Sequence, residues 1–260
     1  MPRLARKDLS TSFFHVIVQG IKKEYIFEKD TYINKYLQLL NQYKDKFNID
    51  ILAYCIMNNH AHILLYIKDV KEMSMFMHRI NSIYAKYYNG VKDKRVGYVF
   101  RNRYISEPIY NEKYLINCIK YIHLNPVKAN MVKNCEEYPY SSYSQLVEKK
   151  QGRGYEILTQ IFGDEIQEML KDNYEEEYIF FDIDIDKNDK INKVIKMFEI
   201  ETGKSRGEIR EDERLLLELV YKLKKDYKIH YKDIIKTINI SKSKMYRIRS
   251  KIGGIKEQTF

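Results

Sequence analysis

The sequence predicts an α+β fold: an antiparallel sheet of the split-βαβ type, as in ferredoxin-like and RRM-like folds, followed by an all-α helix-turn-helix domain. Two observations predict this class. In the first half of the chain, short β-branched and aromatic runs alternate with amphipathic helical patterns in the order strand, helix, strand, strand, helix, strand, helix. After residue 190 only helical periodicity follows. We expect the helices of the first part to pack on one face of its sheet.

The first four elements can be placed from local patterns. Residues 13–19, FFHVIVQ, form the first predicted strand because they are β-branched and aromatic. Helical periodicity follows over residues 30–47. Two further strands are predicted at residues 51–57 and 60–67, and the turn-prone pair Asn58 and Asn59 separates them.

The next elements complete the sheet. A second amphipathic helix is predicted over residues 71–89, and residues 97–100 and 105–109 are predicted to be extended. A third helix is predicted over residues 112–124. We expect it to end there because the residue before Pro126 disfavours the helical region.

The C-terminal part has the pattern of a helix-turn-helix. An amphipathic helix over residues 210–227 is followed by two shorter helices around Asn239 and Ile240, and Ser241 is the predicted N-cap of the last helix. Met245 and Ile248 are expected to face inward. The basic face is formed by Lys242, Lys244, Arg247, Arg249 and Lys251. Such a helix can dock in the major groove of duplex DNA, and the alternative is a three-helix bundle with a solvated basic face.

Charge divides the chain into three parts. The protein has 46 Lys and Arg against 36 Asp and Glu, a formal net charge of +10. Residues 164–190 are strongly acidic, whereas the segments on either side are basic. We therefore predict a catalytic-sized domain at residues 1–150, a helical and acidic connector at residues 151–190, and a helix-turn-helix domain at residues 191–260. The excess of positive charge favours a polyanionic partner.

Several classes of protein are disfavoured by composition. No run approaches the roughly 18 apolar residues that a membrane span needs. The basic N-terminal segment lacks the apolar stretch of a secretory signal. The three cysteines are too widely spaced to indicate a disulfide framework or a zinc knuckle. We expect a cytoplasmic protein that associates with the nucleoid when it binds DNA.

Two pairs of residues have spacings that suit a chemical site. His60 and His62 are two apart on a predicted strand, so their imidazoles share a face and could bind one divalent ion. Tyr121 and Asn125 are four apart on the third helix and also share a face. The alternatives are sheet-packed histidines and an ordinary tyrosine, since the chain has 24 tyrosines. If a tyrosine reacts at this site, Tyr114 is the alternative to Tyr121. It lies seven residues before Tyr121, but it lacks an Asn four residues later.

Seven segments together resemble the single-tyrosine HUH transposases, in particular those of the REP-associated type. In chain order they are HVIVQG, IFEKD, AYCIMNNHAHILL, FMHRINSIYAKYYN, GYVFRNRYIS, YLINCIKYIHLNPVKANMV and YPYSSY, over about residues 10–145. The resemblance implies that His60, His62 and Asn125 bind Mg²⁺ or Mn²⁺ and that Tyr121 is the nucleophile. The sequence departs from the family at Gln19, Asn58 and Ala61, and none of these departures removes an implied ligand.

The resemblance implies a metal-dependent, single-stranded DNA endonuclease and strand transferase that forms a 5′-phosphotyrosine, acting on hairpin DNA. Arg101, Arg103 and Lys120 lie near the motifs and are candidate phosphate contacts. Two other functions remain open at this point: a non-catalytic or domesticated DNA-binding regulator that retains the fold, and a sheet-based RNA-binding module. The sequence leaves open a monomer or a homodimer. His15 and His123 are expected to be structural.

Overall fold

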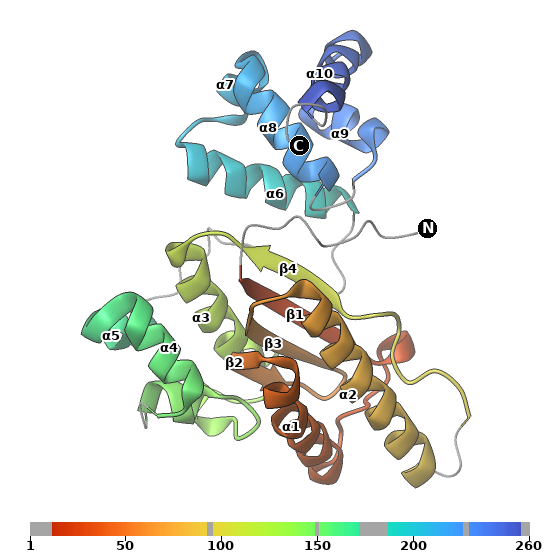
Figure 1. Ribbon diagram of the computed structural model, residues 1–260, viewed down its shortest axis with the longest axis vertical. Coiled ribbons are helices and arrows are strands. Elements are labelled where there is room, and N and C mark those ends of the chain that lie inside the picture. The colour runs from red at the N-terminus through yellow and green to blue at the C-terminus, as the bar shows by residue number, and fades with distance from the viewer. Residues whose placement is uncertain (1–11, 93–95, 149–150, 172–186, 226–228, 256–260) are drawn as a thin grey trace. The chain divides into compact units, whose positions relative to one another are not determined.

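The computed structural model describes residues 12–92, 96–148, 151–171, 187–225 and 229–255. These residues form two compact units, one within residues 4–175 and one within residues 176–260 (Figure 1). In the described ranges, no helix has the length and apolar character needed to cross a membrane.

The first unit is built on a four-stranded antiparallel sheet. Its strands are β1 (Phe13–Gln19), β2 (Ile49–Ile56), β3 (His60–Ile67) and β4 (Ile105–Ile109), in the spatial order β2-β3-β1-β4. Because β3 pairs antiparallel with both β1 and β2, the latter two run parallel on either side of it. This is the predicted split-βαβ topology, and both the fold class and the element order are confirmed.

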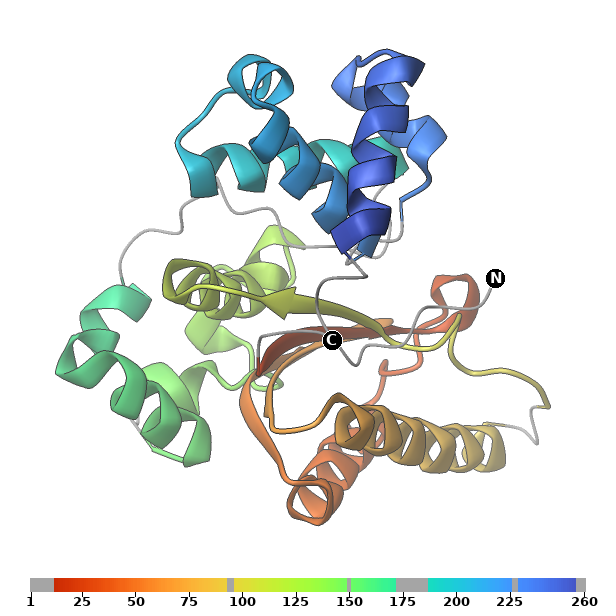
Figure 2. The ribbon, with the colours of Figure 1, turned by 45° about the horizontal axis from the view of Figure 1, so that its top comes forward.

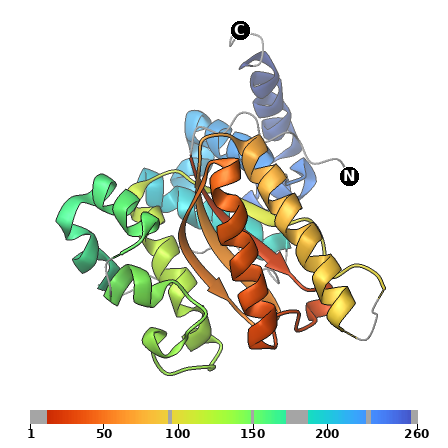
Figure 3. The same cartoon turned by 60° about the horizontal axis from the view of Figure 1, so that its bottom comes forward.

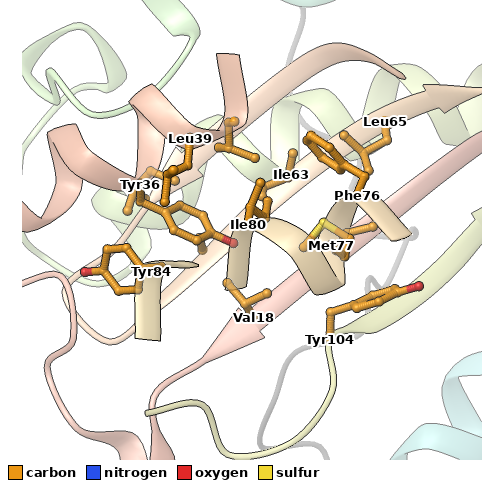
Figure 4. Packing of buried hydrophobic residues seen from close by; sticks show 14 of the residues in the cluster. Val18, Tyr36, Leu39, Ile63, Leu65, Phe76, Met77, Ile80, Tyr84 and Tyr104 are labelled. Carbon is orange, nitrogen blue, oxygen red and sulfur yellow. The ribbon is translucent and has the colours of Figure 1, made fainter. Parts of the chain in front are cut away.

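Two helices, α1 (Asp30–Lys44) and α2 (Val70–Val91), cover one face of the sheet (Figures 2 and 3). Alternate residues of β1 and β3 point toward them and form the main core, shown in Figure 4. Buried tyrosines fill this layer, and the rings of Tyr36 and Tyr84 lie 5.1 Å apart at their centroids. The Tyr84 hydroxyl donates to Ile26 O and that of Tyr36 to Asn81 Oδ1, so the polar ends of both rings have partners.

The helix α3 (Glu112–Lys128) packs on the opposite face of the sheet, so the expectation that all helices lie on one face was wrong. Its Tyr121 ring lies 5.5 Å from that of His62, whereas the alternate β3 residues Ala61 and Ile63 belong to the core under α1 and α2. The physical reason lies in β1, which is buried at every position from Phe14 to Gln19. A strand without polar alternation must be covered on both faces.

Two local predictions were also wrong. The third helix does not end at Leu124 but continues through Pro126 to Lys128. Pro126 removes a single N–H, while Ala129 N still donates to Asn125 O and Met131 N to Pro126 O, which keeps the last turn closed. Residues 97–100 do not form a strand; only Phe100 makes an isolated bridge, to Gly20.

Residues 151–171, which the charge pattern assigns to a connector, form two helices within the first unit. They are α4 (Arg153–Phe162) and α5 (Ile166–Lys171), and α4 packs against β2. Gly154 makes this close approach possible, since a Cβ there would lie 2.7 Å from Leu52 O. The remaining connector prediction, over residues 172–186, lies outside the described residues. The minor elements of this unit are Ile21–Lys23, Asp45–Phe47, Cys135–Glu137 and Gly163–Glu165, which are 3₁₀ turns, and the π-helical turn Ser144–Glu148.

The second unit is all-helical, as predicted. Its helices are α6 (Lys187–Thr202), α7 (Arg206–Glu211), α8 (Glu213–Lys225), α9 (Tyr231–Ile238) and α10 (Lys242–Ile255). They enclose a core of aliphatic side chains with Phe198. The helix predicted from residue 210 instead begins at Glu213, because Asp212 has an extended backbone and its side chain accepts from Arg214 N and Leu215 N.

A three-residue turn joins α9 to α10. Asn239 has a left-handed conformation, with φ 58° and ψ 55°, which ends α9. Ser241 Oγ accepts from Lys244 N at 3.0 Å, so its predicted N-cap role is confirmed. Met245 and Ile248 are buried in the core of the unit, as expected.

The contact between α4 and β2 can be tested with Gly154→Ala. The new methyl group would meet backbone carbonyl oxygens that cannot move independently of β2, so we expect a loss of about 1–3 kcal/mol of unfolding free energy. Gly90→Ala is the matched control: nothing lies within 4 Å of its Cβ position in α2, and we expect a gain of about 0.5–1 kcal/mol. Urea unfolding measures both changes, and a neutral or stabilising Gly154→Ala would contradict the close packing.

Candidate active site

Two imidazoles lie at one end of the central strands. His60 and His62 project from β3 on the face that α3 covers, opposite Gln19 and Ile17 of β1. Their ring centroids are 4.9 Å apart. The tight turn before β3 fixes this position, because Met57 N donates to His60 O at 2.8 Å.

Hydrogen bonds orient both rings. His60 Nδ1 lies 2.6 Å from Asn59 Oδ1, which can only accept, so Nδ1 carries the proton and Nε2 is the basic nitrogen. His62 Nδ1 lies 3.0 Å from His15 Nε2. His62 Nε2 is buried and has no hydrogen-bond partner among the described residues. A buried nitrogen left in this way costs free energy unless a ligand occupies it.

The electrostatics keep His62 neutral. Burial, followed by its neighbours His60 and His15, holds the pKa of His62 well below its usual range. A neutral imidazole retains the lone pair that a metal ion needs.

The helix α3 brings the second pair of residues to these histidines. Asn111 caps the helix by accepting from Tyr114 N at 2.7 Å, and the apolar side chains of the helix are buried against the sheet. The Tyr121 ring lies 5.5 Å from that of His62. Asn125 Nδ2 donates to Tyr121 O at 2.8 Å, so the atom that Asn125 can offer to a cation is Oδ1. The Tyr121 ring thus lies against His62, while the Asn125 side chain is hydrogen-bonded to the backbone of Tyr121 on the same helix.

The donors present fit a divalent cation. Among the described residues there is no cluster of three or more His, Cys, Asp or Glu side chains. A site here must therefore combine the imidazole nitrogens of His60 and His62 with a neutral oxygen such as Asn125 Oδ1. Such a mixed set of nitrogen and oxygen suits Mn²⁺ or Mg²⁺, with imidazole favouring the softer Mn²⁺.

Comparison with known proteins identifies a family that the first unit resembles. Residues 9–125 match the family model described as IS200-like transposase. Over these residues the first unit is similar to this transposase family, and for this reason it is called the transposase unit below. A REP-associated tyrosine transposase of Haemophilus influenzae (strain ATCC 51907 / DSM 11121 / KW20 / Rd) is 24% identical over 140 residues, which are 50% of this chain and 78% of that protein. The resemblance seen in the motifs is confirmed.

Two solved structures are similar to this chain. One is a REP-associated tyrosine transposase bound to a REP hairpin; it is 18% identical, with 56% of this chain and 84% of that chain covered and a TM-score of 0.47. The other is a protein of Deinococcus radiodurans R1 that is described as a transposase. It is 12% identical, with 50% of this chain and 92% of that chain covered and a TM-score of 0.34.

The transposase unit contains one cation that the sequence analysis missed. Lys128 Nζ lies 5.4 Å from the centroid of the Tyr121 ring. The signal was present in the sequence, since Lys128 follows Tyr121 by seven residues and so lies near the same helical face. It was overlooked because the helix was expected to end before Pro126. Lys128 places positive charge beside the phenol.

The alternative residues of the transposase unit have structural partners. Tyr114 is 1% exposed, and its hydroxyl donates to Glu107 Oε1 at 2.5 Å, so it is not accessible to a DNA strand. His123 lies 2.9 Å from Ser142 Oγ, and burial lowers its pKa to about 3, in agreement with a structural role. His15 was also expected to be structural, but it contacts His62 directly.

The candidate phosphate contacts of the transposase unit differ in their placement. Arg101 Nη1 donates to Gln19 Oε1 at 3.1 Å, and Gln19 is opposite His60, so Arg101 lies at the histidine end of the sheet. Arg103 is exposed two residues further on. Lys120 is half-buried on α3, next to Tyr121 in the sequence.

The candidate DNA contacts of the second unit are also unequal. Lys242, Arg247 and Arg249 are exposed on α10. Lys244 is instead held within the unit, because its Nζ donates to Arg210 O at 2.6 Å and lies 3.5 Å from Glu211 Oε2. We therefore expect Lys244 to stabilise the unit more than it contacts a partner.

Proposed function

We propose that this chain nicks single-stranded DNA and transfers the cut strand through a covalent intermediate on Tyr121. The observation that carries the proposal is the contact between the Tyr121 ring and His62, whose buried Nε2 has no hydrogen-bond partner within the described residues. The match of residues 9–125 to the IS200-like transposase family supports the same chemistry.

The proposed step is an in-line displacement at phosphorus. The Tyr121 phenolic oxygen attacks the phosphate after losing its proton, and the bond from phosphorus to the 3′ oxygen breaks. The leaving oxygen keeps the electron pair, takes up a proton and becomes a free 3′-OH, while the 5′ phosphate stays on tyrosine. Because the phosphotyrosine ester conserves the bond energy, a second 3′-OH can attack it and rejoin strands without ATP.

A phenol with a pKa near 10 needs assistance at neutral pH. We assign His60, His62 and Asn125 the role of holding Mg²⁺ or Mn²⁺, which would polarise a non-bridging oxygen of the phosphate. Lys128 adds positive charge beside the phenol. Arg101, fixed by Gln19 at the histidine end of β1, is placed to bind a neighbouring phosphate.

We further propose that Tyr121 attacks DNA bound at the histidines of its own chain, and not at those of a second copy. Tyr121, His60 and His62 are in contact within a single chain, so the site needs no residue from a second copy. From the resemblance of the sequence motifs to REP-associated transposases, we propose DNA that folds into a hairpin as the substrate.

The second unit is proposed to bind duplex DNA through α10. A three-residue turn separates α9 from α10, as in a helix-turn-helix. The exposed cations Lys242, Arg247 and Arg249 would contact phosphates or base edges.

Replacing the nucleophile separates catalysis from binding. We expect Tyr121→Phe to abolish cleavage and covalent attachment while single-strand affinity stays within about twofold, because only the attacking oxygen is removed. Denaturing gels with labelled hairpin DNA measure cleavage and the protein–DNA adduct. Tyr114→Phe is the matched control and should retain adduct formation.

Two results would change the proposal. A covalent adduct formed by Tyr121→Phe would show that Tyr121 is not the nucleophile. Absence of cleavage and adduct in the wild-type protein, with DNA affinity intact, would favour the DNA-binding regulator. Mixing inactive Tyr121→Phe with inactive His62→Ala tests the use of the chain's own nucleophile, and restored activity would indicate exchange between subunits.

The metal role can be measured without DNA. A cation that binds only the folded state at 100 times its Kd adds about 2.7 kcal/mol of stability, so Mn²⁺ should raise the Tm of the wild type. His60→Ala and His62→Ala should each lose this rise and lose metal-dependent cleavage. His78→Ala, at an exposed position of α2, is the control and should retain both. Cleavage that survives EDTA in the two site variants would exclude the metal role.

Duplex binding by α10 can be tested in the full-length protein. We expect the triple variant Lys242→Ala, Arg247→Ala and Arg249→Ala to bind duplex DNA more weakly, with a salt slope that falls by about 0.9 for each phosphate that is no longer neutralised. Lys204→Ala, which removes a cation paired with Glu208 next to α7, is the control and should leave the slope unchanged. Hairpin nicking should be retained in both. An unchanged duplex affinity in the triple variant would leave α10 as a solvated basic face.

A further inference from the structure

A buried series of polar side chains lies behind the two histidines. Glu107 of β4 is opposite His15 of β1 in the sheet, and His15 Nδ1 lies 3.6 Å from Glu107 Oε2. On its other side, His15 Nε2 lies 3.0 Å from His62 Nδ1. The Tyr114 hydroxyl of α3 donates to the second oxygen of Glu107 at 2.5 Å. All four residues are at most 1% exposed.

The charge of Glu107 favours one arrangement of protons along the series. The distance of 3.6 Å between His15 Nδ1 and Glu107 Oε2 is too long for a hydrogen bond, but the nearby carboxylate favours a proton on the nitrogen that faces it. A neutral His15 then has Nε2 as its acceptor, and the proton between the two imidazoles must be on His62 Nδ1. This leaves His62 Nε2 as a bare lone pair.

The other end of the series is a nitrogen atom of His62. Most buried polar atoms in proteins have a hydrogen-bond partner, so a buried one without a partner needs an explanation. Here the series ends at His62 Nε2, which is buried and has no hydrogen-bond partner in the part of the chain that is described. The His62 ring lies against that of Tyr121. The series therefore begins at a carboxylate and ends at the candidate cation site.

We propose that Glu107 and His15 are positioning residues that hold His62 in the Nδ1–H tautomer, so that Nε2 is available to bind the divalent cation. This inference rests on the metal role in the proposed function. It extends the usual pair, in which a carboxylate orients a metal-binding imidazole, by one intervening imidazole. His60 reaches the same tautomer by a separate route, through Asn59 Oδ1.

Glu107→Gln is the most informative test because Gln has nearly the same shape as Glu. The amide can also reverse which groups donate and which accept along the series. The Gln amide oxygen can still accept from Tyr114, and its NH₂ then faces His15 Nδ1 as a donor. His15 Nδ1 becomes an acceptor, His15 Nε2 donates to His62 Nδ1, and the proton of His62 moves to Nε2. A protonated Nε2 cannot bind a cation.

Two measurements on full-length protein read this out. Long-range ¹H–¹⁵N spectra of the metal-free protein report which nitrogen of His62 carries the proton, and we expect Nδ1 in the wild type and Nε2 in Glu107→Gln. Mn²⁺ affinity, followed by the electron paramagnetic resonance of free Mn²⁺, should fall about 10–100-fold in Glu107→Gln. Glu112→Gln, at an exposed position in the first turn of α3, is the control and should change neither.

Further conservative variants distinguish an effect on the orientation of His62 from a loss of folding. Tyr114→Phe removes one donor to Glu107 but keeps the carboxylate beside His15, so we expect the His62 tautomer to be retained. The metal-free Tm of each variant shows whether its fold is intact. If Glu107→Gln is unfolded, His15→Gln provides the second test, and we expect it to weaken Mn²⁺ binding because it removes the ring that accepts from His62.

The outcomes distinguish this inference from the proposed function. Wild-type protein that binds Mn²⁺ through His60 and His62, with unchanged affinity and unchanged His62 tautomer in folded Glu107→Gln, would overturn the inference and leave the proposed function intact. A wild type in which His62 carries its proton on Nε2 would also overturn it. Failure of the wild type to bind Mn²⁺ at all would overturn the metal role, and the inference with it.

Discussion

The structure of the first unit depends on the need to cover both faces of β1 and β3. These strands lie at the centre of the sheet and are almost entirely buried. The layer of α1 and α2 satisfies one face, and α3 must satisfy the other. When α3 buries the second face of the sheet, it also places Tyr121 against His62. Positioning of the candidate nucleophile is therefore a result of packing, and it does not depend on a flexible loop.

The two faces of the sheet contain different chemistry. The face under α1 and α2 is a layer of aliphatic and aromatic side chains whose few hydroxyls have partners. The face under α3 holds His15, His62 and Glu107, all nearly inaccessible to water. Burying such groups costs stability compared with an apolar layer, and an unpaired nitrogen adds to that cost. Departures from good packing are expected where a protein binds or reacts.

Local patterns were enough for the four strands of the sheet, for their order along the chain, and for placing each candidate pair on one face of its element. The spacing of His60 and His62 and that of Tyr121 and Asn125 place each pair on one face of its element, whatever the tertiary structure. The contact between His15 and Glu107 could not be predicted in this way, because it joins residues 92 positions apart and depends on the register of β1 with β4. The extension of α3 to Lys128 was missed because the rule for the residue before proline was applied to a helix that tolerates Pro126 in its last turn.

The register of β1 has an evolutionary consequence. His15, Ile17 and Gln19 face α3, whereas Phe14, Val16 and Val18 face the core under α1 and α2. Inserting or deleting one residue within β1 would exchange these two sets, because successive side chains alternate between faces. An imidazole and an amide would then enter the tyrosine-rich core, and aliphatic groups would line the site. A substitution in β1 therefore alters one side chain on one face, whereas a change in the length of β1 would disturb the core and the candidate site together.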